Sequence, residues 1–120
     1  MRATLEAIAF EVRDVLDTMP VEEGSALRVD GGAAANDLLC QIQADQIGAP
    51  VERPEIVETT ALGAAFLAGL GVGVWSSTDD LRDTWSLDRR FEPVGDRRSA
   101  DAAHRRWSAA VERSKGWAEV

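Results

Sequence analysis

One segment of the sequence, Leu27-Arg28-Val29-Asp30-Gly31-Gly32-Ala33-Ala34-Ala35-Asn36, places two glycines between a short apolar run and a helical pattern. We predict a strand at Leu27–Val29 and a helix at Ala33–Ile47, where apolar residues recur at helical spacing. Gly48 stands where a helix commonly ends in a left-handed residue, and a second strand is predicted at Pro50–Arg53. Two strands that bracket one helix form a βαβ unit with parallel strands. The sequence therefore predicts an α/β fold.

Further helices are predicted on both sides of this unit. Arg2–Met19 carries one apolar stripe and stops before a proline, and Pro20–Ser25 forms the following turn. The apolar segment Ala61–Trp75 is predicted to be a helix that Thr59 or Thr60 caps. It holds four glycines, and each costs about 1 kcal/mol in a helix relative to alanine. We therefore expect another backbone to approach this helix closely.

The last third of the chain is predicted to be mainly helical. A short segment at Asp79–Trp85 is capped by Ser77 or Thr78, Ser86–Phe91 is extended, and Ser99–Trp117 is the final helix. The residues of that helix expected to face inward are Ala103, Trp107, Ala110, Val111 and Trp117. Residues 1–76 are thus predicted to hold the βαβ unit with its flanking helices, and residues 77–120 a C-terminal helical extension.

Length and charge exclude several classes of protein. The 120 residues suit one compact domain, and an apolar content of 45% is ordinary for a globular protein. A net charge of −8 argues against a nucleic-acid partner, because phosphate binding needs clustered Lys and Arg. No signal peptide and no apolar run of membrane-spanning length is found in the sequence. We expect a cytoplasmic protein without a membrane span.

The single cysteine and the single histidine offer little chemistry. Cys40 cannot form an intramolecular disulfide and is expected to be a small core residue. His104 precedes two arginines and is expected to face solvent; alone it supports neither a metal site nor a Ser-His-Asp triad. No metal site is predicted within the chain. The four tryptophans are expected to bury the C-terminal helices rather than stack on bases; they are Trp75, Trp85, Trp107 and Trp117.

The diglycine turn can hold a nucleotide. Glycine lets a ligand lie directly against the backbone, and the start of the following helix favours a phosphate. Asn36, just inside that helix, offers a donor and an acceptor for a base or ribose. A hairpin turn at Asp30-Gly31 is the alternative. Asp30 itself either takes part in phosphoryl transfer or accepts from the N–H groups of its own turn.

The same segment resembles the adenosine-contacting segment of glycerol kinases, which belong to the FGGY family of carbohydrate kinases. The resemblance covers nearly the whole chain. The pairing of Glu52-Arg53-Pro54-Glu55 with Thr59-Thr60-Ala61-Leu62-Gly63-Ala64-Ala65 is typical of glycerol kinases rather than of xylulose or gluconate kinases. The other blocks similar to the family are Arg2–Phe10, Arg13–Leu16, Val51–Glu55, Glu58–Gly69, Phe91–Pro93 and Trp107.

This resemblance implies a partial actin-like (ribonuclease H-like) ATPase domain, helix-rich, with two short parallel strands and C-terminal helices. It implies that Gly32 and Asn36 contact ATP or ADP, that Gly31 shapes the turn, and that Mg²⁺ accompanies the nucleotide. In the family, the phosphate loop, the glycerol-binding residues and the catalytic base lie in the N-terminal domain, so neither catalytic nor glycerol-binding residues are expected in this chain. Val94–Ala100 departs from the pattern of the family's tail, and no regulatory site is carried over to it.

Several functions remain open at this point. The chain is either part of an ATP-dependent glycerol kinase and inactive by itself, or a non-catalytic adenine-nucleotide-binding module, or a truncated remnant that acts only by association. Part of another FGGY sugar kinase is a further alternative. Because the earlier strands of the sheet are expected elsewhere, we expect an unpaired sheet edge and an uncovered glycine-rich helix face. Both favour association with the rest of the kinase or with a second copy.

Overall fold

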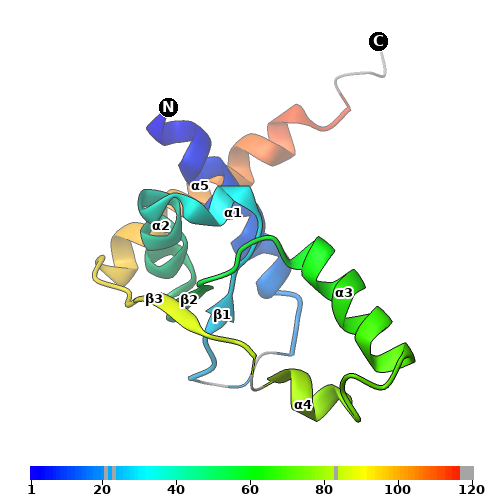
Figure 1. Cartoon of the computed structure of the whole chain (residues 1–120). Helices are drawn as coiled ribbons and strands as arrows, with labels where there is room; N and C mark the ends of the chain where they lie inside the picture. The colour runs from blue at the N-terminus through cyan, green and yellow to red at the C-terminus, as the bar shows by residue number, and fades with distance from the viewer. Residues whose placement is uncertain (21, 23, 83, 117–120) are drawn as a thin grey trace.

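The computed structural model describes residues 1–20, 22, 24–82 and 84–116 of the chain. Figure 1 shows α1, α2 and the strands gathered together, whereas α3 and α4 stand away from them. The Cα radius of gyration is 17.7 Å, while a compact domain of this length has one of about 14 Å. The expectation of a compact domain is therefore wrong, because α3 and α4 extend away from the core. The elements are α1 (Arg2–Leu16), β1 (Leu27–Arg28), the 3-10 helix η1 (Gly32–Ala35), α2 (Asp37–Ile47), β2 (Val51–Pro54), α3 (Thr59–Gly71), α4 (Thr78–Arg82), β3 (Leu87–Phe91) and α5 (Arg97–Ser114).

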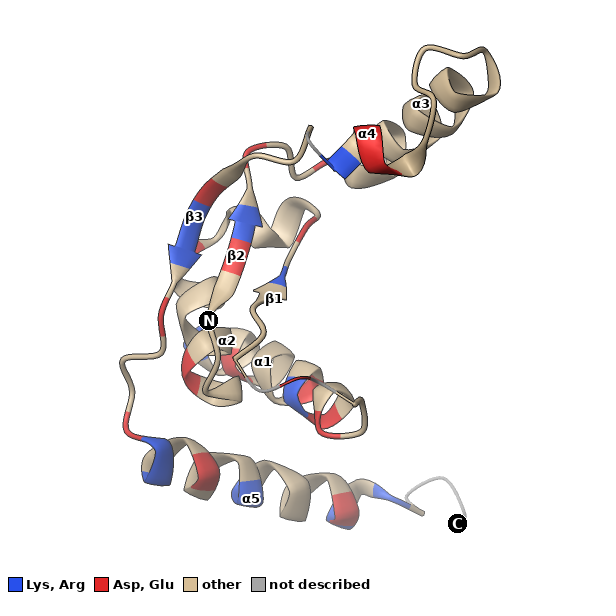
Figure 2. Cartoon of the chain, turned by 90° about the horizontal axis from the view of Figure 1, so that it is seen from below, with Lys and Arg blue, Asp and Glu red and all other residues tan. Residues whose placement is uncertain are grey.

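The described strands form one mixed sheet in the order β1-β2-β3. β1 runs parallel to β2, with Leu27 opposite Val51, which confirms the predicted parallel pair. β3 adds an antiparallel strand on the other side of β2. Residues 86–91 were expected to be extended, but their place in the sheet was not predicted. Charged residues of both signs lie along β2 and β3 (Figure 2). They pair across the two strands: Arg90 donates to Glu52 at 2.6 Å, and Arg53 donates to Asp88 at 2.7 Å.

The core lies between α2 and the sheet. Cys40 and Ala44 of α2 pack against Val51 of β2 and Phe91 of β3, and all four side chains are buried. α1 lies along α2 and contributes the fully buried Ala9. Gly48 ends α2 in the left-handed conformation, with φ 70° and ψ 24°, as predicted. Cys40 is thereby confirmed as a small core residue.

The first helix is shorter than predicted. It ends at Leu16 rather than Met19. The N–H groups of Thr18 and Met19 donate to carbonyls three residues back, at 3.1 and 3.0 Å, so the chain leaves the helix through a tighter turn. Val15 and Met19, which were placed on the apolar stripe, are more than half exposed. The predicted turn that follows includes residues 21 and 23, which lie outside the described residues.

The third helix starts earlier and ends earlier than predicted. It spans Thr59–Gly71, and its cap residue Glu58 makes no side-chain capping bond, so neither predicted threonine caps it. After the helix the chain turns at Gly73, which has a φ of 79°. The Trp75 ring then folds back onto Gly69 and meets Phe66 edge to face at 5.3 Å. The expected close approach at Gly69 is therefore made by an aromatic side chain of the same segment and not by another backbone.

The C-terminal segments follow the predicted order. Ser77 caps α4, since its Oγ accepts from the Asp80 N–H at 3.4 Å. α5 begins at Arg97, two residues before the predicted start, because Asp96 caps it by accepting from Ser99 at 2.9 Å. Among the residues expected inward, Ala103, Trp107 and Val111 are partly buried, Ala110 is exposed, and Trp117 lies outside the described residues. No helix within the described ranges is both long and apolar enough to span a bilayer.

Candidate functional site

The diglycine turn directly follows β1. The Gly31 N–H donates to the Val57 carbonyl at 2.8 Å, and the Gly31 carbonyl accepts from Ala34 at 3.0 Å. Gly31 adopts a φ of 80° and a ψ of 169°, a conformation that is essentially restricted to glycine. The backbone therefore requires glycine at this position.

Gly32 differs from its neighbour. It does not have a positive φ, so other residues could adopt its backbone conformation. A Cβ placed on Gly32 would meet no atom of the described chain within 4 Å. Nothing in the described part of the chain requires glycine here, and the space above the backbone is open. Such open space leaves room for a ligand against the main chain.

Asn36 lies before the helix and not inside it. The expected continuous helix is interrupted: η1 ends at Ala35, Asn36 is extended with φ −87° and ψ 104°, and α2 starts at Asp37. Asn36 is the N-cap of α2, since its Oδ1 accepts from the Leu39 N–H at 3.2 Å. The prediction was wrong because asparagine satisfies helix N–H groups best from the cap position. Asn36 remains exposed, and its Nδ2 group donates to no residue that the structure describes.

Arg53 holds this turn from the neighbouring strand. Its Nη1 donates to the Ala34 carbonyl at 3.0 Å and to Asp37 Oδ1 at 2.7 Å. Its Nε donates to Asp88 at 2.7 Å. Hydrogen bonds to Asp37 and Asp88 raise the pKa of Arg53 above its ordinary value. Reasoning from the sequence did not assign Arg53 to the site. The available signal was its position in the Glu-Arg-Pro-Glu block, which resembles glycerol kinases.

Asp30 accepts from no N–H group of its own turn within the described residues. Its Oδ2 accepts from the Thr59 hydroxyl at 2.5 Å and so links the turn to the start of α3. The reason is that the Gly31 N–H is already bonded to the Val57 carbonyl, which leaves the carboxylate free for another donor.

A pocket of about 400 Å³ lies beside this link, where β1 and β2 end. Its lining includes Arg28, Ile56, Thr59, Phe66 and Trp85. The Arg28 guanidinium lies 4.0 Å from the centre of the Trp85 ring, a cation–π contact. These contacts place Trp85 against the first strand, as expected for a tryptophan that packs a C-terminal segment onto the domain.

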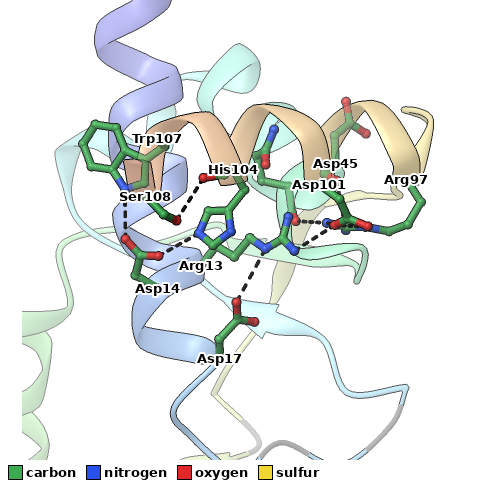
Figure 3. Close-up of polar contacts among 10 residues, drawn as sticks. Arg13, Asp14, Asp17, Asp45, Arg97, Asp101, His104, Trp107 and Ser108 are labelled. Carbon is green, nitrogen blue, oxygen red and sulfur yellow. Dashed lines mark hydrogen bonds and ion pairs between the residues drawn. The ribbon is translucent and has the colours of Figure 1, made fainter. Parts of the chain in front are cut away.

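His104 is not on the solvent face. Its Nε2 lies 2.7 Å from Asp14 Oδ1, and its side chain is 14% exposed (Figure 3). Trp107 donates to the other oxygen of Asp14 at 2.9 Å and stacks on Phe10 with ring centres 5.5 Å apart. The arginines after His104 suggested solvent, but its spacing from Trp107 places both residues on the face that meets α1. This cluster joins α1 to α5 and lies apart from the diglycine turn.

Residues 1–72 match the FGGY family of carbohydrate kinases, C-terminal domain. The chain belongs to this family. It is 52% identical to a glycerol kinase of Caldanaerobacter subterraneus subsp. tengcongensis, over 99% of this chain and 24% of that protein. It is 56% identical to a glycerol kinase of Aromatoleum aromaticum, over 97% of this chain and 24% of that protein. The chain thus spans about a quarter of the length of these curated relatives.

Solved structures of FGGY kinases share the fold. A glycerol kinase of Plasmodium falciparum with ADP aligns over 95% of this chain and 24% of its own, with a TM-score of 0.75 and 35% identity. A ligand-bound xylulose kinase of Lactobacillus acidophilus aligns over 96% of this chain and 25% of its own, with the same TM-score but 20% identity, and bears on the fold alone. The expected α/β, actin-like architecture is confirmed, and the small sheet is mixed.

Proposed function

We propose that this chain forms one wall of the nucleotide site of an ATP-dependent glycerol kinase, which transfers the γ-phosphate of ATP to glycerol and gives glycerol 3-phosphate. The observation that carries the proposal is the open turn at Gly32 beside the Asn36 Nδ2 group, which donates to none of the described residues. It is supported by the relatives near 50% identity, which are named glycerol kinases, and by the similar Plasmodium enzyme, which is described with ADP.

Each residue of the turn has a distinct part in this proposal. Gly31 gives the chain the backbone angles that turn it away from β1. Gly32 lets the nucleotide lie against the main chain. Asn36 uses its Oδ1 to cap α2 and keeps its Nδ2 donor for the adenosine part of the ligand.

The chemistry itself is assigned to the rest of the kinase. Phosphoryl transfer depends on the positioning of the reactants and on neutralisation of the phosphate charge. Mg²⁺ supplies that neutralisation when it is bound. In the described ranges no three His, Cys, Asp or Glu side chains gather into a metal site. We propose that Mg²⁺ enters the site with the nucleotide, whose phosphates would hold it. The phosphate loop, the catalytic base and the glycerol contacts belong to the N-terminal domain by resemblance, and we expect the 120-residue chain by itself to be inactive.

Association with the rest of the kinase, or with a second copy, is also part of the proposal. α3 carries no charged residue (Figure 2), and Leu67 and Val72 are 72% and 79% exposed. β1 lies at one edge of the described sheet. Both surfaces suit a partner that supplies the remaining strands. On this reading, residues 1–76 form the actin-like part and residues 77–120 the C-terminal extension.

Two further parts of the proposal concern specificity and location. We favour glycerol over a sugar as the substrate, because the xylulose and gluconate kinases among the similar structures are 20–26% identical to this chain, whereas the similar glycerol kinase of Plasmodium falciparum is 35% identical. We also propose a cytoplasmic location. Cys40 is an unpaired thiol, and reduced cysteines are ordinary in cytosolic proteins.

Substitution of Asn36 tests the nucleotide site. Asn36→Ser keeps an N-cap of equal quality but removes the Nδ2 donor. We expect the variant to unfold at the same urea concentration as the wild type and to bind ADP about tenfold more weakly in calorimetric titration, the effect of one lost hydrogen bond. An unchanged ADP affinity would contradict the assignment of Asn36.

Addition of the missing domain separates the functions that were left open. The 120-residue chain is mixed with an N-terminal fragment of a related glycerol kinase, and glycerol 3-phosphate is measured with ATP and Mg²⁺ present. Product formed only by the mixture supports the kinase. ADP binding without product supports a binding module. If the mixture forms no product and the chain binds no ADP, association is the only activity that remains.

A further inference from the structure

Arg53 forms hydrogen bonds to residues before and after Asn36 in the chain, but not to Asn36 itself. The Ala34 carbonyl, two residues before Asn36, accepts from Arg53 Nη1 at 3.0 Å. The carboxylate of Asp37, the next residue along the chain, accepts from the same nitrogen at 2.7 Å. One guanidinium on β2 therefore fixes the end of η1 and the start of α2 at the point where Asn36 stands between them.

The guanidinium is itself held in place. Its side chain is only 12% exposed, and both Nε and Nη2 lie 2.7 Å from one oxygen of Asp88 on β3. Hydrogen bonds between charged groups are stronger than neutral ones, and the planar fork of arginine sets the direction of each N–H. The ion pair with Asp88 on β3 thus fixes the orientation of Arg53, and Arg53 in turn fixes the positions of Ala34 and Asp37.

We propose that Arg53 is a positioning residue for the nucleotide site: by bracing Ala34 and Asp37 it sets the direction in which the Asn36 amide meets its ligand. This inference rests on the proposed nucleotide-binding function. It goes beyond that function because it assigns the orientation of Asn36 to a residue on the neighbouring strand that makes no hydrogen bond to Asn36.

Other contacts also hold the turn, but among the described side chains Arg53 alone bonds both Ala34 and Asp37. The backbone bonds are Gly31 to Val57 at 2.8 Å, Ala34 to Gly31 at 3.0 Å, Asn36 to Ala33 at 3.1 Å and Cys40 to Asn36 at 3.1 Å. Arg89 donates to the other oxygen of Asp37 at 2.5 Å and does not bond Ala34. The Cys40 thiol also donates to the Ala34 carbonyl at 3.3 Å. The buried core cluster of Cys40, Ala44, Val51 and Phe91 does not include Arg53. Loss of the guanidinium should therefore loosen the turn while the core remains folded.

The chain offers a matched control and a built-in reporter. Arg90, on β3, makes a similar pair across the same two strands with Glu52 at 2.6 Å, and its side-chain bonds go to Glu52 and Glu92 rather than to the described residues of the turn. Cys40 is the only cysteine, and its thiol shares the Ala34 carbonyl with Arg53. Because Cys40 is fully buried, an aromatic disulfide reagent reaches it only when the segment around it opens. Among variants that unfold at the same urea concentration, the labelling rate therefore reports how firmly the turn is held, and it needs no nucleotide.

The experiment compares Arg53→Met, Arg53→Lys, Asp37→Asn and Arg90→Met with the wild-type chain. We expect Arg53→Met to weaken ADP binding about tenfold and to speed Cys40 labelling about fivefold. Asp37→Asn should act in the same direction in both measurements. Arg53→Lys should recover part of both losses, because lysine keeps the charge but lacks the fork. Arg90→Met should match the wild type in both measurements.

The outcomes separate this inference from the proposed function. If Asn36→Ser weakens ADP binding and Arg53→Met does not, the positioning role is overturned and the nucleotide site stands. If the wild-type chain binds no ADP, the proposed function fails, and the labelling rate still decides whether Arg53 sets the turn: a faster rate in Arg53→Met supports it, and an unchanged rate overturns it. Equal effects of Arg90→Met and Arg53→Met would show general loosening of the sheet and would also overturn it.

Discussion

At the scale of single residues, the two adjacent glycines of the turn have different constraints. Gly31 has a φ of 80°, whereas Gly32 has an ordinary backbone and open space around it. We expect Gly31→Ala to lower the free energy of unfolding by about 1–3 kcal/mol, the cost of a strained backbone. Gly32→Ala should leave it unchanged or raise it by up to about 1 kcal/mol, because alanine restricts the unfolded chain. Urea denaturation measures both, and equal losses in the two variants would contradict this account.

The site residues show what could be predicted from local sequence. The turn at the two glycines was expected from its own residue types, but these also allowed a hairpin, which the structure does not form because η1 begins at Gly32 and α2 follows it. The capping role of Asn36 was missed because the alanines before it favour a helix that continues through it. Arg53 could not be found from spacing, since its contacts join residues that are 16, 19 and 35 positions apart in the chain. Long-range ion pairs of this kind leave no periodic signal.

At the scale of elements, α5 is held largely by charged groups. Asp101 accepts from Arg97 at 2.5 Å within α5 and from Arg13 of α1 at 2.8 Å. Hydrogen bonds from Arg97 and then Arg13 lower the pKa of Asp101 to about 2. Partial burial raises the pKa of Asp14, but its hydrogen bonds with Trp107 and His104 outweigh burial and lower it. Because both carboxyls have a lower pKa in the folded chain than in the unfolded chain, each stabilises the fold fully only above about pH 4.

We therefore expect the contact between α1 and α5 to weaken as the pH falls from about 4 to about 2, where Asp101 takes up its proton, and protonation of Asp14 below about pH 4 acts in the same direction. Fluorescence of Trp107, which stacks on Phe10, reports the contact in a variant that carries phenylalanine at the other three tryptophans. The same variant with Asp101→Asn should show a weaker contact at pH 6 and a smaller change on acidification. An identical acid transition with and without Asp101 would count against this role.

The elements also differ in how well the sequence predicted them. The first two strands and α2 followed from periodicity, since three of the four residues in the buried core cluster lie within one βαβ unit. The pairing of β3 did not, because Leu87-Asp88-Arg89-Arg90-Phe91 lacks an apolar alternation and meets β2 largely through charged pairs. The early end of α3 depends on Trp75 folding back onto Gly69, a contact that helical spacing cannot indicate.

At the scale of the whole molecule, α3 makes the chain more extended than a compact domain. Leu67 is 72% exposed on this helix, and Val74 just after it is 66% exposed. Exposed apolar patches of this kind favour association. In sedimentation velocity we expect the 120-residue chain to show a mass that rises with concentration, and Leu67→Glu to shift that rise to higher concentration by about tenfold, the effect of losing one buried leucine contact. Val94→Glu is the matched control, because Val94 is 78% exposed but lies between β3 and α5, away from α3. A chain that stays monomeric throughout, or an equal effect of the two substitutions, would mean that α3 is not the surface through which copies associate.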